Sequence, residues 1–189
     1  AALFAAFAAM PGLEARYTEE KHLALLAVPL TSAGRLYFLQ PGYLARVVEK
    51  PEPSKLLITP DKLRMADRDG VEVIDLQQSE RLRLFVTSLV RVFRGDRAAL
   101  TEHYSIEYTP SPDDPAAWTL ALAPKRAPLD HMMKSLTLRG KGVAVTGFEL
   151  VEPNGDRTVT KIIAADPERE FSVAEKTELF GIEVGERAR

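Results

Sequence analysis

The residues that most often carry chemistry in proteins are sparse in this chain and stand far apart. The three histidines, His22, His103 and His131, fall in different segments, without the spacing of metal ligands. Cysteine is absent, which removes thiolate zinc ligands, a cysteine nucleophile and disulfides. The motifs H-E-x-x-H, G-x-S-x-G and S-x-x-K do not occur. The sequence therefore predicts a protein that is not an enzyme and needs no metal or cofactor.

Three short motifs that could hold an ion or a proton are better explained as local structure. Asp67-Arg68-Asp69-Gly70 has some of the acidic spacing of a calcium loop but no glutamate at the offset that such a loop requires, so it predicts a β-hairpin. Gly140-Lys141-Gly142 lies between two predicted strands and not before a helix, so it predicts a turn and no phosphate loop. The pair Glu19-Glu20 is interpreted as the solvated edge of a strand.

Composition and charge narrow the class of protein. Of 189 residues, 46% are hydrophobic and 28% charged, which is typical of a globular protein. The 25 Lys and Arg nearly balance 27 Asp and Glu, which argues against a nucleic-acid partner. The apolar run at residues 1–10 is too short to span a bilayer and lacks a basic leader. Because the chain opens on Ala, we expect that a segment before it, such as a signal peptide, has been removed.

The helices and strands that must position any functional residue can be placed from the residues that break or cap them. The alanine-rich residues 1–10 predict a short helix that ends at Pro11-Gly12. Residues 13–76 are broken by Pro, Gly and Asp into a meander of about six antiparallel strands. Residues 79–104 then change to helical periodicity, with Ser79 and Asp96 as caps of two helices.

Strands return after this helical insertion, at 105–109, 118–123, 135–139, 143–152 and 157–164, and Asn154-Gly155 predicts a tight hairpin. The segment 166–189 is charged, with scattered apolar residues. No repeat or linker divides the chain. We therefore expect one α+β domain over residues 1–189, built on an antiparallel sheet of about ten strands.

Alternation in the strands indicates that one face of this sheet is large and apolar. Leu36 and Phe38 share a face, as do Trp118, Leu120 and Leu122. The helices could fill the concavity as an ordinary core, which the residues alone favour. Alternatively, a strongly curved sheet could leave an apolar cavity for a lipid-like ligand.

The order of several short motifs resembles that of the LolA-type periplasmic lipoprotein carriers. After the first helix come Tyr17-Thr18-Glu19, Ser32 to Phe38 (SAGRLYF) and Pro41-Gly42-Tyr43-Leu44. Further along, the resemblance continues with Asp61-Lys62-Leu63, with Asn154 to Thr158 (NGDRT), and with Phe171 as a terminal strand. The resemblance covers nearly the whole chain in order.

This resemblance implies an incomplete antiparallel barrel of ten to eleven strands, with short helices as a lid over its concave face. It implies a monomeric periplasmic carrier that shelters the acyl chains of lipoproteins, or of another lipidated or amphiphilic cargo. The carrier would exchange cargo with an inner-membrane donor complex and an outer-membrane acceptor. The alternative is a non-catalytic scaffold or sensor that binds a protein partner. The predicted cavity lining is Leu36, Phe38, Leu44, Phe85, Leu89, Phe93, Trp118, Leu120 and Leu122.

The sequence departs from the family at one position that the resemblance links to the lid. Carriers of this type hold an arginine before the P-x-x-L proline, where it bonds the lid helices, whereas this chain has Gln40. Gln40 can donate a hydrogen bond but has neither the charge nor the two-pronged geometry of arginine. Arg46 is the nearest basic residue, so Gln40 and Arg46 are the two candidates for a lid latch. We expect the Arg46 guanidinium to point into the concavity and to bond the helical lid. The alternative is an outward Arg46 on the solvent face of an amphipathic strand, and the sequence does not decide between the two.

Overall fold

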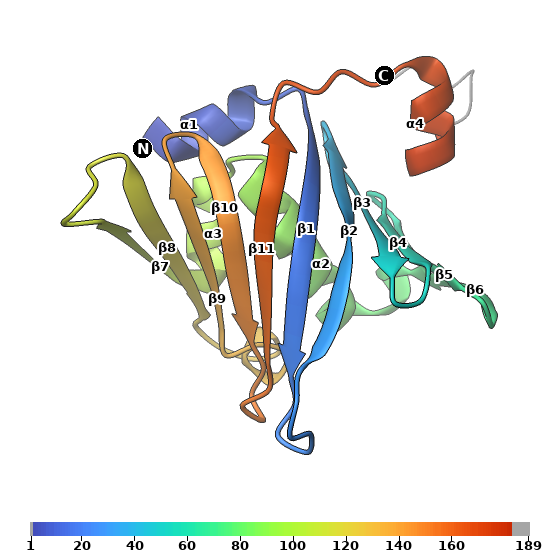
Figure 1. Cartoon of the computed structure of the whole chain (residues 1–189), viewed down its shortest axis with the longest axis horizontal. Coiled ribbons are helices and arrows are strands. Elements are labelled where there is room, and N and C mark those ends of the chain that lie inside the picture. The colour runs from blue at the N-terminus through green and yellow to red at the C-terminus, as the bar shows by residue number, and fades with distance from the viewer. Residues whose placement is uncertain (1, 183–189) are drawn as a thin grey trace.

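Alternating strands that are joined by short turns form one curved antiparallel sheet in the computed structural model, which describes residues 2–182 (Figure 1). The strands of this part of the chain are β1 (Gly12–His22), β2 (Leu30–Leu39), β3 (Tyr43–Lys50), β4 (Ser54–Ile58), β5 (Lys62–Asp67), β6 (Gly70–Asp75), β7 (Tyr104–Pro110), β8 (Ala117–Pro124), β9 (Ser135–Lys141), β10 (Ala144–Val151) and β11 (Arg157–Asp166). The predicted α+β fold, with an incomplete antiparallel barrel of ten to eleven strands, is confirmed.

The two halves of the sheet meet where β1 pairs with β11. The strand order is β6-β5-β4-β3-β2-β1-β11-β10-β9-β8-β7. All neighbouring strands except β1 and β11 are therefore consecutive in the chain. The β1–β11 pairing sets Glu19 opposite Thr160 and thereby joins residues that are far apart in sequence. Strands β6 and β7 are the two edges and do not pair with each other, so the barrel stays open.

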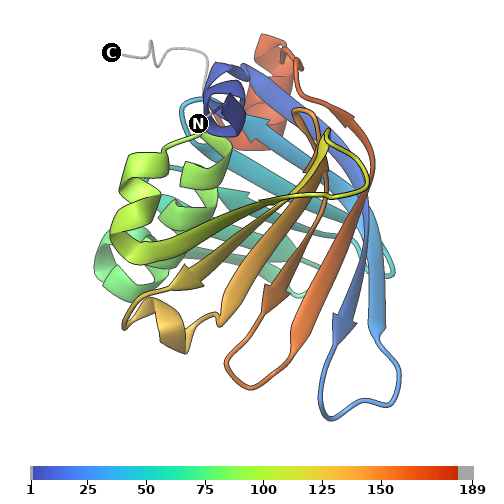
Figure 2. The same cartoon turned by 90° about the vertical axis from the view of Figure 1, so that its left-hand side faces the viewer.

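The helical segment between these two edge strands crosses the concave face (Figure 2). It consists of a 3-10 turn (Leu76–Gln78), α2 (Glu80–Phe93) and α3 (Arg97–His103). Both predicted caps are confirmed, because the Ser79 hydroxyl accepts from the Leu82 amide at 3.3 Å and Asp96 accepts from the Ala99 amide at 3.1 Å.

The N-terminal helix α1 (Ala2–Ala9) lies across the same side of the sheet. Phe4 and Phe7 bury their rings in a cluster with Trp118, and Gly95 lets the end of α2 approach them. A side chain at Gly95 would stand 2.0 Å from the Phe4 carbonyl oxygen, and its φ of +66° also favours glycine. Close contact between α1 and the end of α2 thus depends on Gly95, the second residue after α2.

A fourth helix, α4 (Val173–Phe180), was not expected from the sequence, which placed a terminal strand at Phe171. Phe171 lies in the segment before α4 and is buried with Phe180 against β2, β3 and β4. Their neighbours Tyr37 and Ala45 alternate with the concave-facing residues, so α4 covers the convex face. The strand interpretation of Phe171 is wrong because its hydrophobic partners lie outside the barrel.

The first two strands of the sheet are joined by a turn of seven residues. β1 ends at His22, the chain turns through residues 23–29, and β2 begins at Leu30. The tip consists of aliphatic residues and proline, without the glycine or asparagine that signals a tight hairpin. Asp156 holds it by accepting from the Ala24 amide at 2.8 Å. The turn between β1 and β2 projects from the sheet (Figure 1). Within it, Leu25 is 96% exposed.

If α4 belongs to the folded core, Phe180→Ala should lower the free energy of unfolding by about 3–5 kcal/mol. The Phe180 side chain is 1% exposed and packs edge-on against the Phe171 ring. Val173→Ala, on the same helix and 61% exposed, should change stability by less than about 0.5 kcal/mol. Urea denaturation measures both values. Equal effects of the two substitutions would mean that α4 does not dock on the convex face.

Candidate functional site

An apolar cavity of about 200 Å³ lies between α2 and the concave face of the sheet. Helix α2 contributes Leu89, Val92 and Phe93 to its wall. The strands contribute the remaining lining residues, which are Glu19, Leu36, Leu44, Arg46, Leu56, Ile58, Leu136, Leu138, Phe148, Leu150 and Thr158. A second space of about 50 Å³ reaches under α1, and it shares Leu36, Phe93, Leu138 and Phe148 with the first.

The volume decides what the cavity can hold. A dry cavity of about 150 Å³ is known to bind benzene, whereas pockets for drug-sized ligands occupy about 300–1,000 Å³. The cavity of about 200 Å³ therefore has room for a short alkyl segment. A complete long acyl chain would need α2 to move away from the sheet.

The nine predicted lining residues divide between the cavity and the core beside it. Leu36, Leu44, Leu89 and Phe93 line the cavity. Phe38 is fully buried and stacks on Phe93, with ring centroids 5.5 Å apart.

The other four are packed closer to the helices. Trp118, Leu120 and Leu122 belong to the cluster beneath α1 and α3, while Phe85 is half-buried and contacts this cluster from α2. The six of the nine that lie in strands share the concave side of the sheet with α2, which carries the other three. Alternation cannot tell which inward side chains the helices cover.

Trp118 contacts α1 and does not line the cavity. Its indole Nε1 donates to the Gly142 carbonyl at 2.8 Å, and its ring meets Phe7 at 6.3 Å between centroids. Trp118 fluorescence should therefore report the position of α1, and a ligand in the larger cavity needs another probe.

One charged pair interrupts the apolar wall. Arg46 donates from Nη2 to Glu19 Oε1 at 2.7 Å, and Thr160 donates to Glu19 Oε2 at 2.9 Å. The Glu19 and Arg46 side chains are 14% and 30% exposed. Arg46 lines the cavity, and the side chain that it bonds is Glu19 of β1 and not the helical lid that was expected.

Glu19 is the residue of this site that the sequence interpretation missed. It was assigned with Glu20 to a solvated edge, although its alternation with Tyr17 and Ala15 places it on the inner face. Arg46 also lies 5.2 Å from the centre of the Tyr17 ring. Burial raises the pKa of the Tyr17 hydroxyl above its ordinary value, and the nearby Arg46 charge opposes that rise.

The other latch candidate, Gln40, makes the contact with a covering helix. Its side-chain amide donates to the carbonyl of Met10, the residue that follows α1, at 3.3 Å. Gln40 thus contacts the residue after α1, whereas the Arg46 charge lies in the cavity wall and is paired with Glu19.

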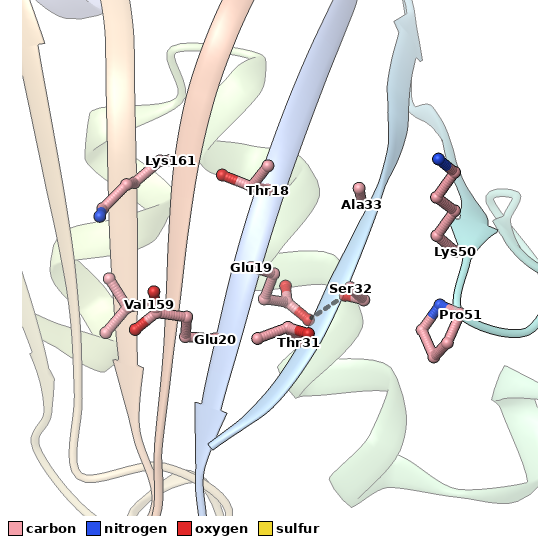
Figure 3. Close-up of a pocket in the computed structure, with 10 residues that line it drawn as sticks. All are labelled: Thr18, Glu19, Glu20, Thr31, Ser32, Ala33, Lys50, Pro51, Val159 and Lys161. Atoms are coloured by element: carbon pink, nitrogen blue, oxygen red, sulfur yellow. Dashed lines mark hydrogen bonds between the residues drawn. The ribbon is translucent and has the colours of Figure 1, made fainter. Parts of the chain in front are cut away.

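A wider depression of about 670 Å³ adjoins the charged pair, on β1, β2, β3 and β11 (Figure 3). Four of its ten lining residues, Thr18, Thr31, Lys50 and Lys161, are exposed and polar, and the strand pairing places them on the convex face, opposite to Glu19. Glu19 lines both this depression and the apolar cavity. Pairing between β2 and β3 starts only at Ala33, so Ser32 and the residues before it lie beyond the end of β3. The polar end of the cavity therefore lies beside a solvent-facing hollow.

Other kinds of site are not found in the part of the chain that the structure describes. Within residues 2–182 no group of three or more His, Asp or Glu side chains is arranged to hold a metal ion. None of the helices described is long and apolar enough to cross a bilayer.

An open half-barrel whose helices cover an apolar cavity defines a class of binding proteins. The family model described as outer membrane lipoprotein carrier protein LolA-like matches residues 6–179. The chain belongs to this LolA-like family, as the sequence motifs indicated. No curated protein matches the sequence.

Solved structures share the fold at low sequence identity. A DUF1329 family protein from Desulfovibrio piger superposes with a TM-score of 0.54 at 11% identity, covering 94% of this chain and 98% of its own. A lipoprotein-sorting domain from Vibrio parahaemolyticus gives 0.51 at 8% identity, covering 94% of both chains. MucB gives 0.52 at 8% identity, covering 92% of this chain. This chain spans only 54–60% of the length of the MucB chains that it matches.

The charged pair in the cavity should be coupled more strongly than an exposed pair with similar geometry. In a double-mutant cycle of Arg46→Met and Glu19→Gln, we expect a coupling energy of about 1–3 kcal/mol, because each change leaves the other group poorly solvated. Arg68 and Glu52, which are 3.0 Å apart but about 70% exposed, form the control pair. Their cycle should give about 0.5 kcal/mol or less in urea denaturation. Equal coupling energies would show that the cavity pair is fully hydrated.

Proposed function

We propose that this protein is a periplasmic, non-catalytic carrier of acyl chains, whose cargo is a lipoprotein or another lipidated amphiphile. The observation that carries the proposal is the apolar cavity beneath α2, in a member of the LolA-like family. Its donor and acceptor would be membrane complexes, as the family resemblance implies.

The chemistry of acyl binding requires no reactive group. Each methylene removed from water contributes about 0.8 kcal/mol, so an apolar wall is sufficient for affinity. The cavity is bounded by α2, which is held between two chain turns and could move as a unit. Movement of α2 away from the sheet would enlarge the cavity. Its return would shield the bound acyl chain from water.

The exposed tip of the β1–β2 hairpin supports contact with a lipid surface. Residues 23–30 (LALLAVPL) carry no polar side chain. Leu25, Leu26, Val28 and Leu30 are between 45% and 96% exposed. Aliphatic side chains without hydrogen-bonding groups suit the non-directional environment of a bilayer better than a protein interface, where Trp, Tyr and Arg dominate. The tip would hold the open end of the sheet against a membrane during transfer.

Binding of an alkyl probe tests the central part of the proposal. A neutral environment-sensitive dye, N-phenyl-1-naphthylamine, should fluoresce in the cavity and be displaced by acyl compounds. Leu89→Trp fills the cavity from α2. It should raise the dissociation constant of the acyl compound about tenfold or more, because it excludes two or more methylenes from the cavity. Arg83→Trp, on the exposed side of α2, is the matched control and should leave binding unchanged.

Mass spectrometry of organic extracts from the purified native protein should reveal acylated compounds. If no lipid is extracted and Leu89→Trp binds the dye as the unaltered protein does, the cavity is not the binding site. The protein would then fit the alternative function, a scaffold or sensor that binds a protein partner. The MucB fold is compatible with that alternative, because MucB has been crystallised in complex with MucA.

The hairpin tip should affect transfer and not binding. Leu25→Asp places a charge at the most exposed aliphatic position and should slow the transfer of a fluorescent acyl compound to phosphatidylcholine vesicles by about tenfold or more. Its affinity for the same compound in solution should not change. Val71→Asp, at another exposed hairpin position (57% exposed), controls for added charge. Equal transfer rates for both variants would exclude a role for the tip.

A further inference from the structure

A single polar spot in the cavity wall bears on the kind of acyl compound that the protein would bind, if the proposed function is correct. Fourteen residues line the cavity, and eleven of them are Leu, Ile, Val or Phe. The other three, Glu19, Arg46 and Thr158, come from β1, β3 and β11. Burying an ion pair in such a wall costs solvation energy, so it contributes little to stability relative to an apolar pair.

Arg46 is held in place while most of its donors stay unused. A guanidinium group has five N–H donors. Among residues 2–182, the Arg46 side chain donates a hydrogen bond to Glu19 alone. The Tyr17 ring packs against the guanidinium, with 5.2 Å between its centre and the Arg46 Cζ. These two contacts fix a planar donor group at the wall of the cavity, where a ligand could accept from it.

Glu19 determines which charge a ligand group can carry when it binds at Arg46. Its two carboxylate oxygens accept from Arg46, Thr160 and Ser32, so it is well paired inside the protein. The Arg46–Glu19 pair is neutral as a unit. A ligand carboxylate bound at Arg46 would stand beside the Glu19 carboxylate, and this repulsion is strong at the edge of an apolar site. A neutral carbonyl oxygen has no such penalty.

The space beside the pair leaves room for the rest of a ligand's polar group. Glu19 lines both the apolar cavity and the solvent-facing depression on β1–β3 (Figure 3). An acyl chain whose carbonyl lies at Arg46 would keep its hydrocarbon part in the cavity. Its larger head group would extend past Glu19 into the depression, where polar side chains and water are available.

We propose that Arg46 is a specificity-determining residue that recognises the neutral carbonyl of an ester-linked or amide-linked acyl chain. Glu19 positions the guanidinium and rejects free fatty acids. The protein therefore selects acyl groups that are attached to a larger molecule, and it discriminates against the carboxylates that hydrolysis of such molecules releases.

Three probes with the same alkyl length test this selectivity. Methyl octanoate carries the neutral carbonyl, octanoate at pH 7.5 carries the carboxylate, and methyl octyl ether lacks the carbonyl. Each displaces N-phenyl-1-naphthylamine from the protein, and the measured quantity is the ratio of their dissociation constants. The unaltered protein should bind the ester at least about tenfold more tightly than octanoate, because the Glu19 carboxylate repels octanoate and does not repel the ester.

The variant Glu19→Gln/Arg46→Met removes both charges together and leaves no unpaired ion. Relative to the unaltered protein, its preference for the ester over the ether should fall about tenfold, while the ether binds as before. Arg35→Met/Glu49→Gln removes a comparable cross-strand pair, 3.0 Å apart, from the convex face and should not alter the ratio. Circular dichroism and urea denaturation confirm that each variant is folded.

The outcomes separate this inference from the proposed function. If the unaltered protein binds octanoate as tightly as the ester, or if the ester-to-ether ratio is the same in all three proteins, the inference is wrong and acyl binding still stands. If none of the probes and no dye binds, the proposed function itself fails. Should the cavity variant not fold, the ester-to-ether ratio of the unaltered protein decides the matter, because only the ester offers Arg46 a carbonyl oxygen, and equal binding of the two would overturn the inference.

Discussion

The concave face of the whole sheet must be covered by the helical segment that joins the two edge strands, together with α1. Eleven strands spaced by about 4.8 Å span roughly 48 Å before curvature, whereas a helix of 14 residues is about 21 Å long. Helix α2 with its neighbours α1 and α3 therefore buries part of the apolar face and leaves an internal volume. The cavity follows from this mismatch between a wide curved sheet and the short helices available to cover it.

The polar pair gains its properties from the same geometry. Arg46 and Glu19 would form an ordinary cross-strand ion pair on a flat, solvated sheet, with little energetic effect. The curvature turns their strand faces inward, and α2 closes off water on one side. On the other side, β2 extends beyond the end of β3, and a solvent-facing depression there reaches Glu19. The pair thus lies between the apolar cavity and a solvent-facing hollow.

The sequence was sufficient to predict the elements whose signals are local. Amphipathic periodicity and the caps Ser79 and Asp96 located α2 and α3 within one or two residues. Alternation in β2 and β8 grouped the apolar residues that share one face, because side-chain direction in a strand follows from the backbone alone. The LolA-like motifs, in their order along the chain, were enough to indicate the family and the open barrel. These features depend on neighbours within a few residues.

The tertiary structure decided the features that depend on distant partners. The pairing of β1 with β11 brings Thr160 to Glu19, a contact across 141 residues that no local pattern encodes. Helix α4 is only weakly amphipathic and forms where Phe180 and Phe171 find apolar partners on the convex face, so the charged segment around it gave no clear signal. Which inward side chains line the cavity, and which lie beneath helices, depends on where α1 and α2 come to rest. A sequence encodes the direction of a side chain, but its burial is set by whatever packs against it.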